Sequence, residues 1–260
     1  TLEQEVNEAK KTDFIVKDKK ITVVNRKPYA PFTTSTLQQT ASSRLGMTPS
    51  RTMRAAQKLY EAGHITYMRT DSSTISHAAQ KSILGYIDKK YGNSFVESRV
   101  FKTKSKGAQE AHEAVRPTDI SKENIKLGRD EEMLYKLIHA RTVASQMSDA
   151  KVERTHIDIG NQKLSHLLSL DGQKIVFAGW LKHDPDGSGS DVILPAIEIG
   201  DRCELEKIEI VDKETSPPNR FSQAGLIKEL EKRGIGRPST YASIISTIET
   251  RDYVTVENKA

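Results

Sequence analysis

The sequence predicts a multidomain α+β protein in which a helical segment is inserted into a β-rich domain. Runs rich in β-branched residues occur on both sides of a helical stretch, at residues 13–24 and again within 151–211. Pairs of helices with capping residues at their starts occur at residues 33–62 and 222–250. Strands and helices therefore fall in separate parts of the chain, as is typical of the α+β class.

The β-rich domain is expected to be discontinuous and to comprise residues 1–27 and 149–216. Its first segment contains the end of a helix and then one long strand or a hairpin at residues 13–24. Its second segment contains predicted strands at residues 151–159, 163–170, 174–182 and 201–211. Turns are expected at Gly160, Asp171-Gly172, residues 184–189 and Gly200. The glycine-rich run at 184–190 is predicted to be a hairpin tip, since no helix or Lys-Ser/Thr pair follows it.

The helical domain is predicted to span residues 28–148 and to begin at a proline-rich break. Thr33 or Thr34 can cap a first helix to Leu45, and Thr48-Pro49 opens a second helix that ends near Ala62. A short strand over residues 64–70 would make this a helix-turn-helix with a wing. Two further helices are expected at residues 76–91 and 129–147.

The third predicted domain covers residues 217–260 and repeats this plan. It has helices at 222–233 and from about 237 to 250, with a strand at 253–256. When Pro49 is aligned with Pro238, Tyr67 falls on Val256. The repeated plan therefore does not require a tyrosine at that place, which weakens a purely packing role for Tyr67.

Composition excludes several classes of protein. The chain has 260 residues with a net charge of +5, and its one cysteine can build neither a disulfide framework nor a zinc cluster. No apolar run is long enough to cross a membrane, so we expect a cytoplasmic protein without a membrane partner. The chain begins at Thr1 and not at Met, which leads us to expect a piece of a longer protein.

Three polar side chains alternate along the predicted strand that ends the first helix pair. Tyr67, Arg69 and Asp71 are expected to share one of its faces. A phenol, with a pKa near ~10, is a poor nucleophile unless its developing charge is stabilised. A guanidinium matches phosphate geometry, so the pair suits attack on a phosphodiester. These three residues alone leave open that the tyrosine only packs and the arginine is only solvated.

Three longer runs carry a resemblance to a known family. Residues 59–72 read LYEAGHITYMRTDS, residues 111–118 read AHEAVRPT, and residues 228–245 read KELEKRGIGRPSTYASII. In this order they resemble signatures of the type IA DNA topoisomerases, and the first is similar to the active-site segment. They are spread between residues 59 and 245, and three runs in the same order make the resemblance far more specific than a single short motif.

The resemblance implies a role for particular residues. Tyr67 would be the nucleophile that bonds to a 5′ phosphate of DNA, while Arg69 and His112 would stabilise the charged transition state. The resemblance also implies contacts with the DNA backbone at Arg237, Thr240 and Arg251. We further expect DNA contacts at Thr66, Asp71, Ser72, Arg116 and Ser239. The β-rich domain would act as a hinge that lifts the helical domain, so that another DNA strand can pass.

The resemblance also implies the cofactor and the partners. The intact enzyme would use Mg²⁺ but no ATP, with the metal ligands in an N-terminal domain that this chain does not match. Its substrate would be single-stranded or negatively supercoiled DNA, in the bacterial nucleoid. Two alternatives stay open. One is a topoisomerase III-like decatenase, although the residues at Glu113 and Arg116 are more similar to those of topoisomerase I. The other is a winged-helix module that binds DNA without catalysis.

Overall fold

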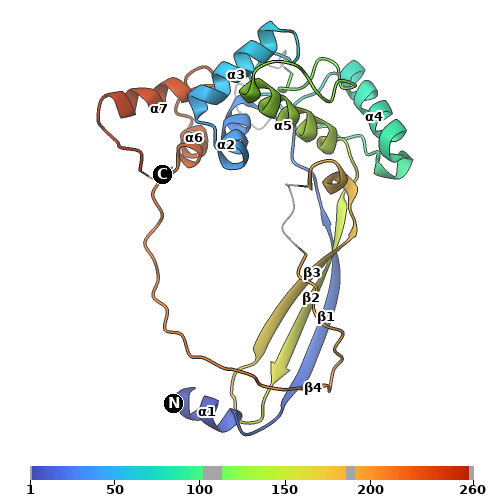
Figure 1. The fold of residues 1–260 in the computed structure, drawn as a ribbon, viewed down its shortest axis with the longest axis vertical. Helices are drawn as coiled ribbons and strands as arrows, with labels where there is room; N and C mark the ends of the chain where they lie inside the picture. The colour runs from blue at the N-terminus through green and yellow to red at the C-terminus, as the bar shows by residue number, and fades with distance from the viewer. Residues whose placement is uncertain (1, 102–112, 186–190, 258–260) are drawn as a thin grey trace. The chain divides into compact units, whose positions relative to one another are not determined.

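A computed structural model of the chain describes residues 2–101, 113–185 and 191–257. In chain order its elements are α1 (Leu2–Ala9), β1 (Phe14–Arg26), α2 (Thr34–Leu45), α3 (Pro49–Glu61), α4 (His77–Tyr91), η1 (Asn93–Phe95), α5 (Arg129–Ser145), β2 (Ala150–Gly160), β3 (Leu168–Phe177), η2 (Gly179–Lys182), β4 (Arg202–Cys203), α6 (Gln223–Lys232) and α7 (Tyr241–Thr250). The predicted α+β class is confirmed (Figure 1).

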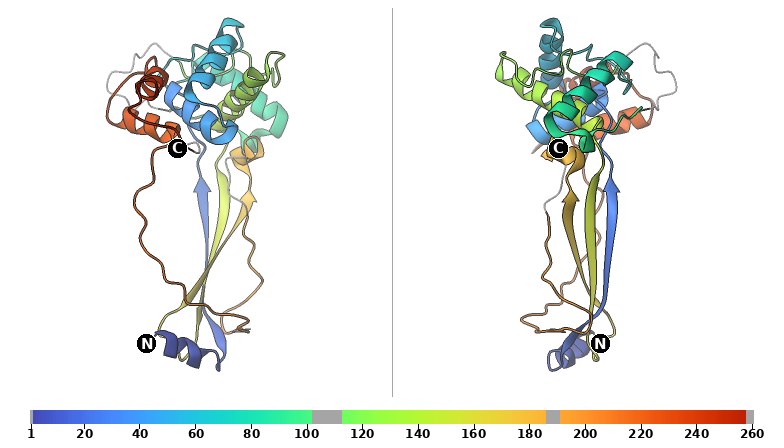
Figure 2. Two further views of the ribbon diagram at one scale, coloured as in Figure 1. Left: turned by 60° about the vertical axis from the view of Figure 1, so that its left-hand side comes forward. Right: turned by 90° about the vertical axis from the view of Figure 1, so that its right-hand side faces the viewer.

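The described chain forms two compact units. One, the sheet unit, comprises residues 1–27, 149–179 and 186–217, and the other, the helical unit, comprises 28–148, 180–185 and 218–260. The sheet of the first unit has the strand order β3-β2-β1-β4, and all of its neighbouring strands are antiparallel. Figure 2 shows the three long strands side by side. The segments before and after the helical insertion therefore pair directly, β1 with β2.

The expected turn at Asp171-Gly172 is wrong, and so are the two strands it was to separate. β3 runs without a break through this dipeptide, since Asp171 pairs with His156 and Gly172 with Thr155. A side chain at Gly172 would lie 2.5 Å from Leu194, where residues 192–194 cross the strand. The glycine thus permits close approach of a neighbouring segment and does not mark a turn.

The end of the predicted strand 174–182 and the predicted strand at 201–211 are also corrected. Residues 179–182 form a 3-10 helix, and of the expected strand at 201–211 only Arg202–Cys203 pair with β1. β-branched composition alone therefore overstated the sheet, because strands persist only where a partner edge is available. The predicted hairpin tip lies mostly in residues 186–190, outside the described residues.

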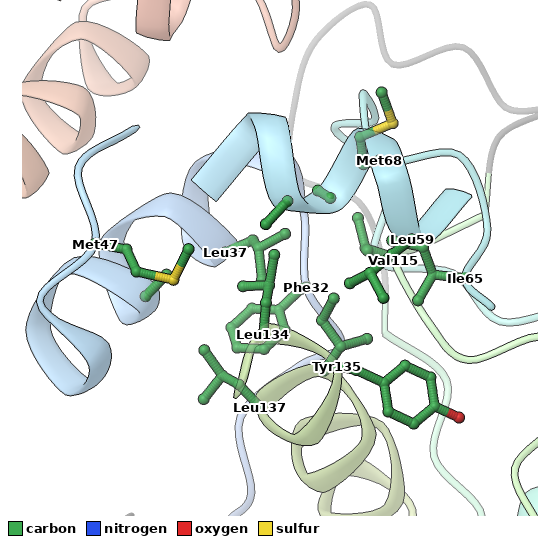
Figure 3. Close-up of a cluster of buried hydrophobic side chains, with 14 residues drawn as sticks. Phe32, Leu37, Met47, Leu59, Ile65, Met68, Val115, Leu134, Tyr135 and Leu137 are labelled. Atoms are coloured by element: carbon green, nitrogen blue, oxygen red, sulfur yellow. The ribbon is translucent and has the colours of Figure 1, made fainter. Parts of the chain in front are cut away.

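The helical unit is built around a core between α2, α3 and α5. Phe32, Leu37, Leu59, Leu134 and Ile138 are fully buried in it, and Figure 3 shows most of its larger side chains converging. The start of α2 is closed by a capping box between Thr33 and Thr36, and its end by Gly46 in the left-handed region. The sequence had left Thr33 and Thr34 as alternative caps, and Thr33 is the one that forms.

Residues 180–185 return from β3 into the helical unit, although the sequence had placed them in the β-rich domain. Trp180 is 1% exposed, and its backbone N–H donates to the Ser148 carbonyl at 3.0 Å. Asp184 pairs with Arg44 of α2 at 2.7 Å. Buried apolar area and a buried ion pair therefore assign this short segment to the helical unit, which no sequence pattern had indicated.

The two predicted wing strands do not form among the described residues. In 64–70 only Ile65 makes an isolated bridge, to Pro117, and residues 253–256 have no strand pairing. α6 packs against α2 through the hydrogen bond from the Ser35 hydroxyl to Glu231 (2.7 Å). Residues 218–260 thereby join the same compact unit as α2 and α3.

Candidate active site

The candidate site begins where α3 ends. Gly63 takes a φ of +75°, a left-handed conformation that costs other residues strain. The N–H groups of Gly63 and His64 donate to the carbonyls of Tyr60 and Leu59, which closes the helix. The chain then turns into the segment of residues 64–72, which carries five of the eleven predicted site residues.

One side of this segment is held by residues 114–118. The Thr66 N–H donates to the Arg116 carbonyl at 2.9 Å, and the Thr118 N–H donates to the His64 carbonyl at 3.0 Å. The Thr66 hydroxyl donates to the Ala114 carbonyl at 2.7 Å and accepts from the Arg116 N–H at 3.0 Å. Thr66, a predicted DNA contact, therefore already uses its hydroxyl to join two of the three signature runs.

The other side is held by Thr34, the first residue of α2. Its fully buried hydroxyl donates to the Met68 carbonyl at 2.6 Å and accepts from the Thr70 N–H at 2.8 Å. Its backbone N–H donates to the Thr70 carbonyl at 2.9 Å. Sequence reasoning missed this tether, because a threonine at a helix start carries no signal of a bond to residues 34 to 36 positions away.

Burial alternates along the segment even though no strand ladder forms. Met68 and Thr70 are 1% and 2% exposed, whereas Tyr67 is 45% exposed and Arg69 is also exposed. Asp71 is half-buried. Tyr67 and Arg69 thus lie on one exposed side, with Asp71 less exposed, and the hydrogen bonds of Thr34 and Thr66 take the place of a strand partner.

Tyr67 and Arg69 have few polar contacts of their own. Within residues 2–101, 113–185 and 191–257, the Tyr67 hydroxyl forms no hydrogen bond and the Arg69 guanidinium forms no ion pair. The Tyr67 ring packs edge-to-face on Tyr60, with ring centroids 5.3 Å apart at 69°. A phenol and a cation are therefore both accessible to a phosphate from solvent.

Arg116 is placed differently from Arg69. Its guanidinium is 14% exposed, pairs with Glu113 at 2.5 Å and donates to the Pro117 carbonyl at 2.9 Å. Burial opposes ionisation of Glu113, but hydrogen bonds from Ser76 and Arg116 outweigh it and hold the pKa of Glu113 below its usual value. The Arg116 guanidinium is thus already paired with a carboxylate, which a DNA phosphate would have to displace. His112, the remaining residue of this run, lies outside the described residues.

The last group of predicted contacts lies around α7. The Thr240 hydroxyl accepts from the Arg237 N–H at 2.8 Å, so it closes the turn before the helix. Burial, and then the carboxylates of Glu231 and Asp71, raise the pKa of the Tyr241 phenol. Asp71 therefore lies within electrostatic reach of the start of α7, which links the first and third signature runs.

Arg251 lies at the opposite end of α7. It lines a groove of about 480 Å³ together with Ser50 and Met53 of α3 and the hydroxyl-bearing side of α7. Ser72 is 3% exposed and accepts from the Thr74 N–H at 3.1 Å, so its hydroxyl stabilises a local turn. Among the described residues, no hydrogen bond connects Ser239 to Tyr67. Hydrogen bonds thus join Arg116 to Thr66, the neighbour of Tyr67, whereas Arg237 and Arg251 lie near opposite ends of α7.

The chain belongs to the DNA topoisomerase family, because the model of that family matches residues 1–260. It is 46% identical over 253 residues to DNA topoisomerase 1 of Pasteurella multocida, which covers 95% of this chain and 29% of that protein. It is 47% identical over 239 residues to DNA topoisomerase 1 of Escherichia coli, covering 90% of this chain and 27% of the relative. The resemblance stated from the sequence is thereby confirmed.

A solved structure supports the same assignment. Full-length topoisomerase I from Thermotoga maritima matches with a TM-score of 0.86 at 32% identity, over 98% of this chain and 44% of that chain. The chain thus spans less than a third of the curated relatives named above. No helix of the described part is long and apolar enough to cross a membrane.

Proposed function

We propose that this chain is the central part of a type IA DNA topoisomerase, an isomerase that relaxes negatively supercoiled DNA without ATP. The observation that supports this most directly is the exposed, unbonded phenol of Tyr67 beside the exposed guanidinium of Arg69. Both stand on backbone that Thr34 and Thr66 hold from two sides. Family membership supplies the reaction class, and the site supplies a nucleophile and a cation for it.

The proposed reaction is transfer of a phosphoryl group between two oxygens. The Tyr67 hydroxyl loses its proton to a base outside the described residues, and its oxygen attacks the phosphorus of a DNA phosphodiester. The bond from phosphorus to the 3′ oxygen breaks, leaving a 5′-phosphotyrosyl link and a 3′ hydroxyl that takes up a proton. Arg69, with His112 as the second cation, stabilises the negative charge of the transition state. Religation reverses these steps, so no ATP is consumed.

The proposed DNA path follows the signature runs. Thr66, Asp71 and Ser72 would place the backbone beside Tyr67, while Arg237, Ser239, Thr240 and Arg251 would hold it along α7. The packing of α7 against α3, the helix that precedes Tyr67, supports one continuous path. Arg116 would contact a phosphate only if its ion pair with Glu113 opened. The pair α2–α3, joined by residues 46–48, remains winged-helix-like in this proposal.

The sheet unit would be the hinge, and further parts of the enzyme would complete the site. Among the described residues no cluster of His, Cys, Asp or Glu can hold a metal ion. These side chains therefore do not fit the family's Mg²⁺, and we assign its ligands to an N-terminal domain, with no step of this site passing through the metal. Single-stranded or negatively supercoiled DNA would be the substrate, in the bacterial cytoplasm.

The test of the nucleophile uses the intact enzyme and end-labelled single-stranded DNA. Tyr67→Phe should abolish the protein-linked label that appears after denaturation, because it removes only the attacking oxygen. DNA affinity and its salt dependence should stay unchanged, since the phosphate contacts remain. Arg69→Ala should slow cleavage by about 10²–10³-fold without abolishing it. A labelled adduct with Tyr67→Phe would show that another residue is the nucleophile.

A second test concerns the division of roles within the enzyme. The chain alone should fail to relax a supercoiled plasmid, because it spans less than a third of the length of its relatives and the proposal assigns part of the site to an N-terminal domain. Adding the N-terminal domain as a separate polypeptide should restore some relaxation if the roles are divided as proposed. Relaxation by the chain alone would contradict this division.

A further inference from the structure

The Tyr67 side chain has a contact, with the ring of Tyr60, that plays no part in the proposed reaction. The backbone on either side of Tyr67 is fixed, through the Thr66 N–H to Arg116 and through the carbonyl of Met68 to Thr34. The phenol has no hydrogen bond within the described residues, and 45% of the side chain is exposed. Its ring packs edge-to-face on Tyr60, and this contact can restrict its rotamer.

Tyr60 is well placed to supply such a restriction. It occupies the last turn of α3, directly after Leu59, which is fully buried in the core of the helical unit. The left-handed Gly63 reverses the chain and brings Tyr67 back against it. The two rings meet edge-to-face, a favoured arrangement for an aromatic pair.

The Tyr60 ring is not part of the core of the helical unit. It is 42% exposed and does not belong to the buried cluster of the helical unit. Within the described residues its hydroxyl forms no hydrogen bond. An aromatic side chain that is anchored through its helix, yet open to solvent and in contact with the nucleophile, is suited to orient that nucleophile.

We infer that Tyr60 is a positioning residue, whose ring holds the Tyr67 phenol in the direction needed for attack on the phosphodiester. The inference rests on the proposed function, because it assumes that Tyr67 is the nucleophile. It assigns the role to the ring and not to the Tyr60 hydroxyl. An aromatic pair contributes about 0.5–1.5 kcal/mol beyond area burial, which corresponds to a rate effect of about 2- to 13-fold.

The experiment compares Tyr60→Phe with Tyr60→Leu in the intact enzyme. Single-turnover cleavage of labelled single-stranded DNA is measured at saturating DNA, and the dissociation constant is measured separately. Tyr60→Phe, which keeps the ring, should cleave at the original rate. Tyr60→Leu should cleave about 2- to 13-fold more slowly with an unchanged dissociation constant. Urea denaturation followed by circular dichroism shows whether both variants of the intact enzyme remain as stably folded as the original.

Each alternative role predicts a different result. A weaker dissociation constant for Tyr60→Leu, with an unchanged rate at saturation, would mean that Tyr60 stacks on DNA and would overturn the inference. An equal loss in Tyr60→Phe would assign the effect to the hydroxyl and would also overturn it. An adduct formed by Tyr67→Phe would overturn the proposed nucleophile itself. If Tyr67→Phe is inactive and Tyr60→Leu cleaves normally, only the positioning role of Tyr60 is refuted.

Discussion

The tether between Thr34 and the segment of Tyr67 can be tested by removing one hydroxyl. Thr34→Val keeps the shape of the side chain but leaves the Thr70 N–H and the Met68 carbonyl without this partner. Both residues are at most 2% exposed, so water cannot replace the bond without a rearrangement. An unsatisfied buried group costs about 1–3 kcal/mol, so the two groups together should cost about 2–6 kcal/mol in unfolding free energy.

Thr142→Val is the matched control in the same unit. Thr142 is also fully buried, and its hydroxyl donates to the Ile138 carbonyl at 2.8 Å. That carbonyl lies four residues earlier in α5 and accepts a backbone bond of the helix as well, so it keeps a partner in the variant. The control should therefore lose only about 0.5–1.5 kcal/mol.

The assay is urea denaturation followed by the fluorescence of Trp180. It is the single tryptophan of the chain and lies buried in the helical unit, so it reports on the unit that contains both substitutions. Hydrogen exchange at the Thr70 amide gives a local reading, which should lose protection in Thr34→Val alone. Equal stability losses in the two variants, with unchanged protection at Thr70, would refute the tether.

Two further predictions concern charge in the helical unit. Asp184→Asn should lower the unfolding free energy by about 3 kcal/mol, because it leaves the largely buried Arg44 without its partner. Asp130→Asn, in the more exposed pair with Arg51, should lower it by only about 0–1 kcal/mol. Equal losses of the two variants in urea denaturation would contradict this. Burial, and then the positive charge of neighbouring His139 and Lys90, lower the pKa of His183 to about 4. The unfolded imidazole takes up its proton near pH 6.5 while the folded one stays neutral, so stability should fall by about 3 kcal/mol between pH 6.5 and 4. His183→Gln should flatten that part of the profile, and an unchanged slope would contradict the assignment.

The sequence alone determined those features that depend on neighbouring residues. The caps at Thr33 and Thr48 and the stop at Gly63 set the ends of α2 and α3, because capping depends on side chains within a few positions of the helix end. The exposure of Tyr67 and Arg69 on one side of the segment followed from extended backbone, in which alternate side chains face the same way. The family was also recognisable, since each of the three signature runs is an unbroken stretch of sequence.

Tertiary structure alone decided which segments pair across long distances. The dipeptide Asp171-Gly172 has the composition of a turn, yet it lies inside β3, because β2 supplies a full ladder and residues 192–194 cross at the glycine. Residues 64–70 have the composition of a strand, yet hydrogen bonds from Thr34 and Thr66 hold them without one. Local composition sets what backbone a segment can adopt, whereas hydrogen-bond partners far along the chain select among those possibilities. The contact of Tyr60 with Tyr67 belongs to the second kind, because it exists only once α3 and the segment after Gly63 have folded back on each other.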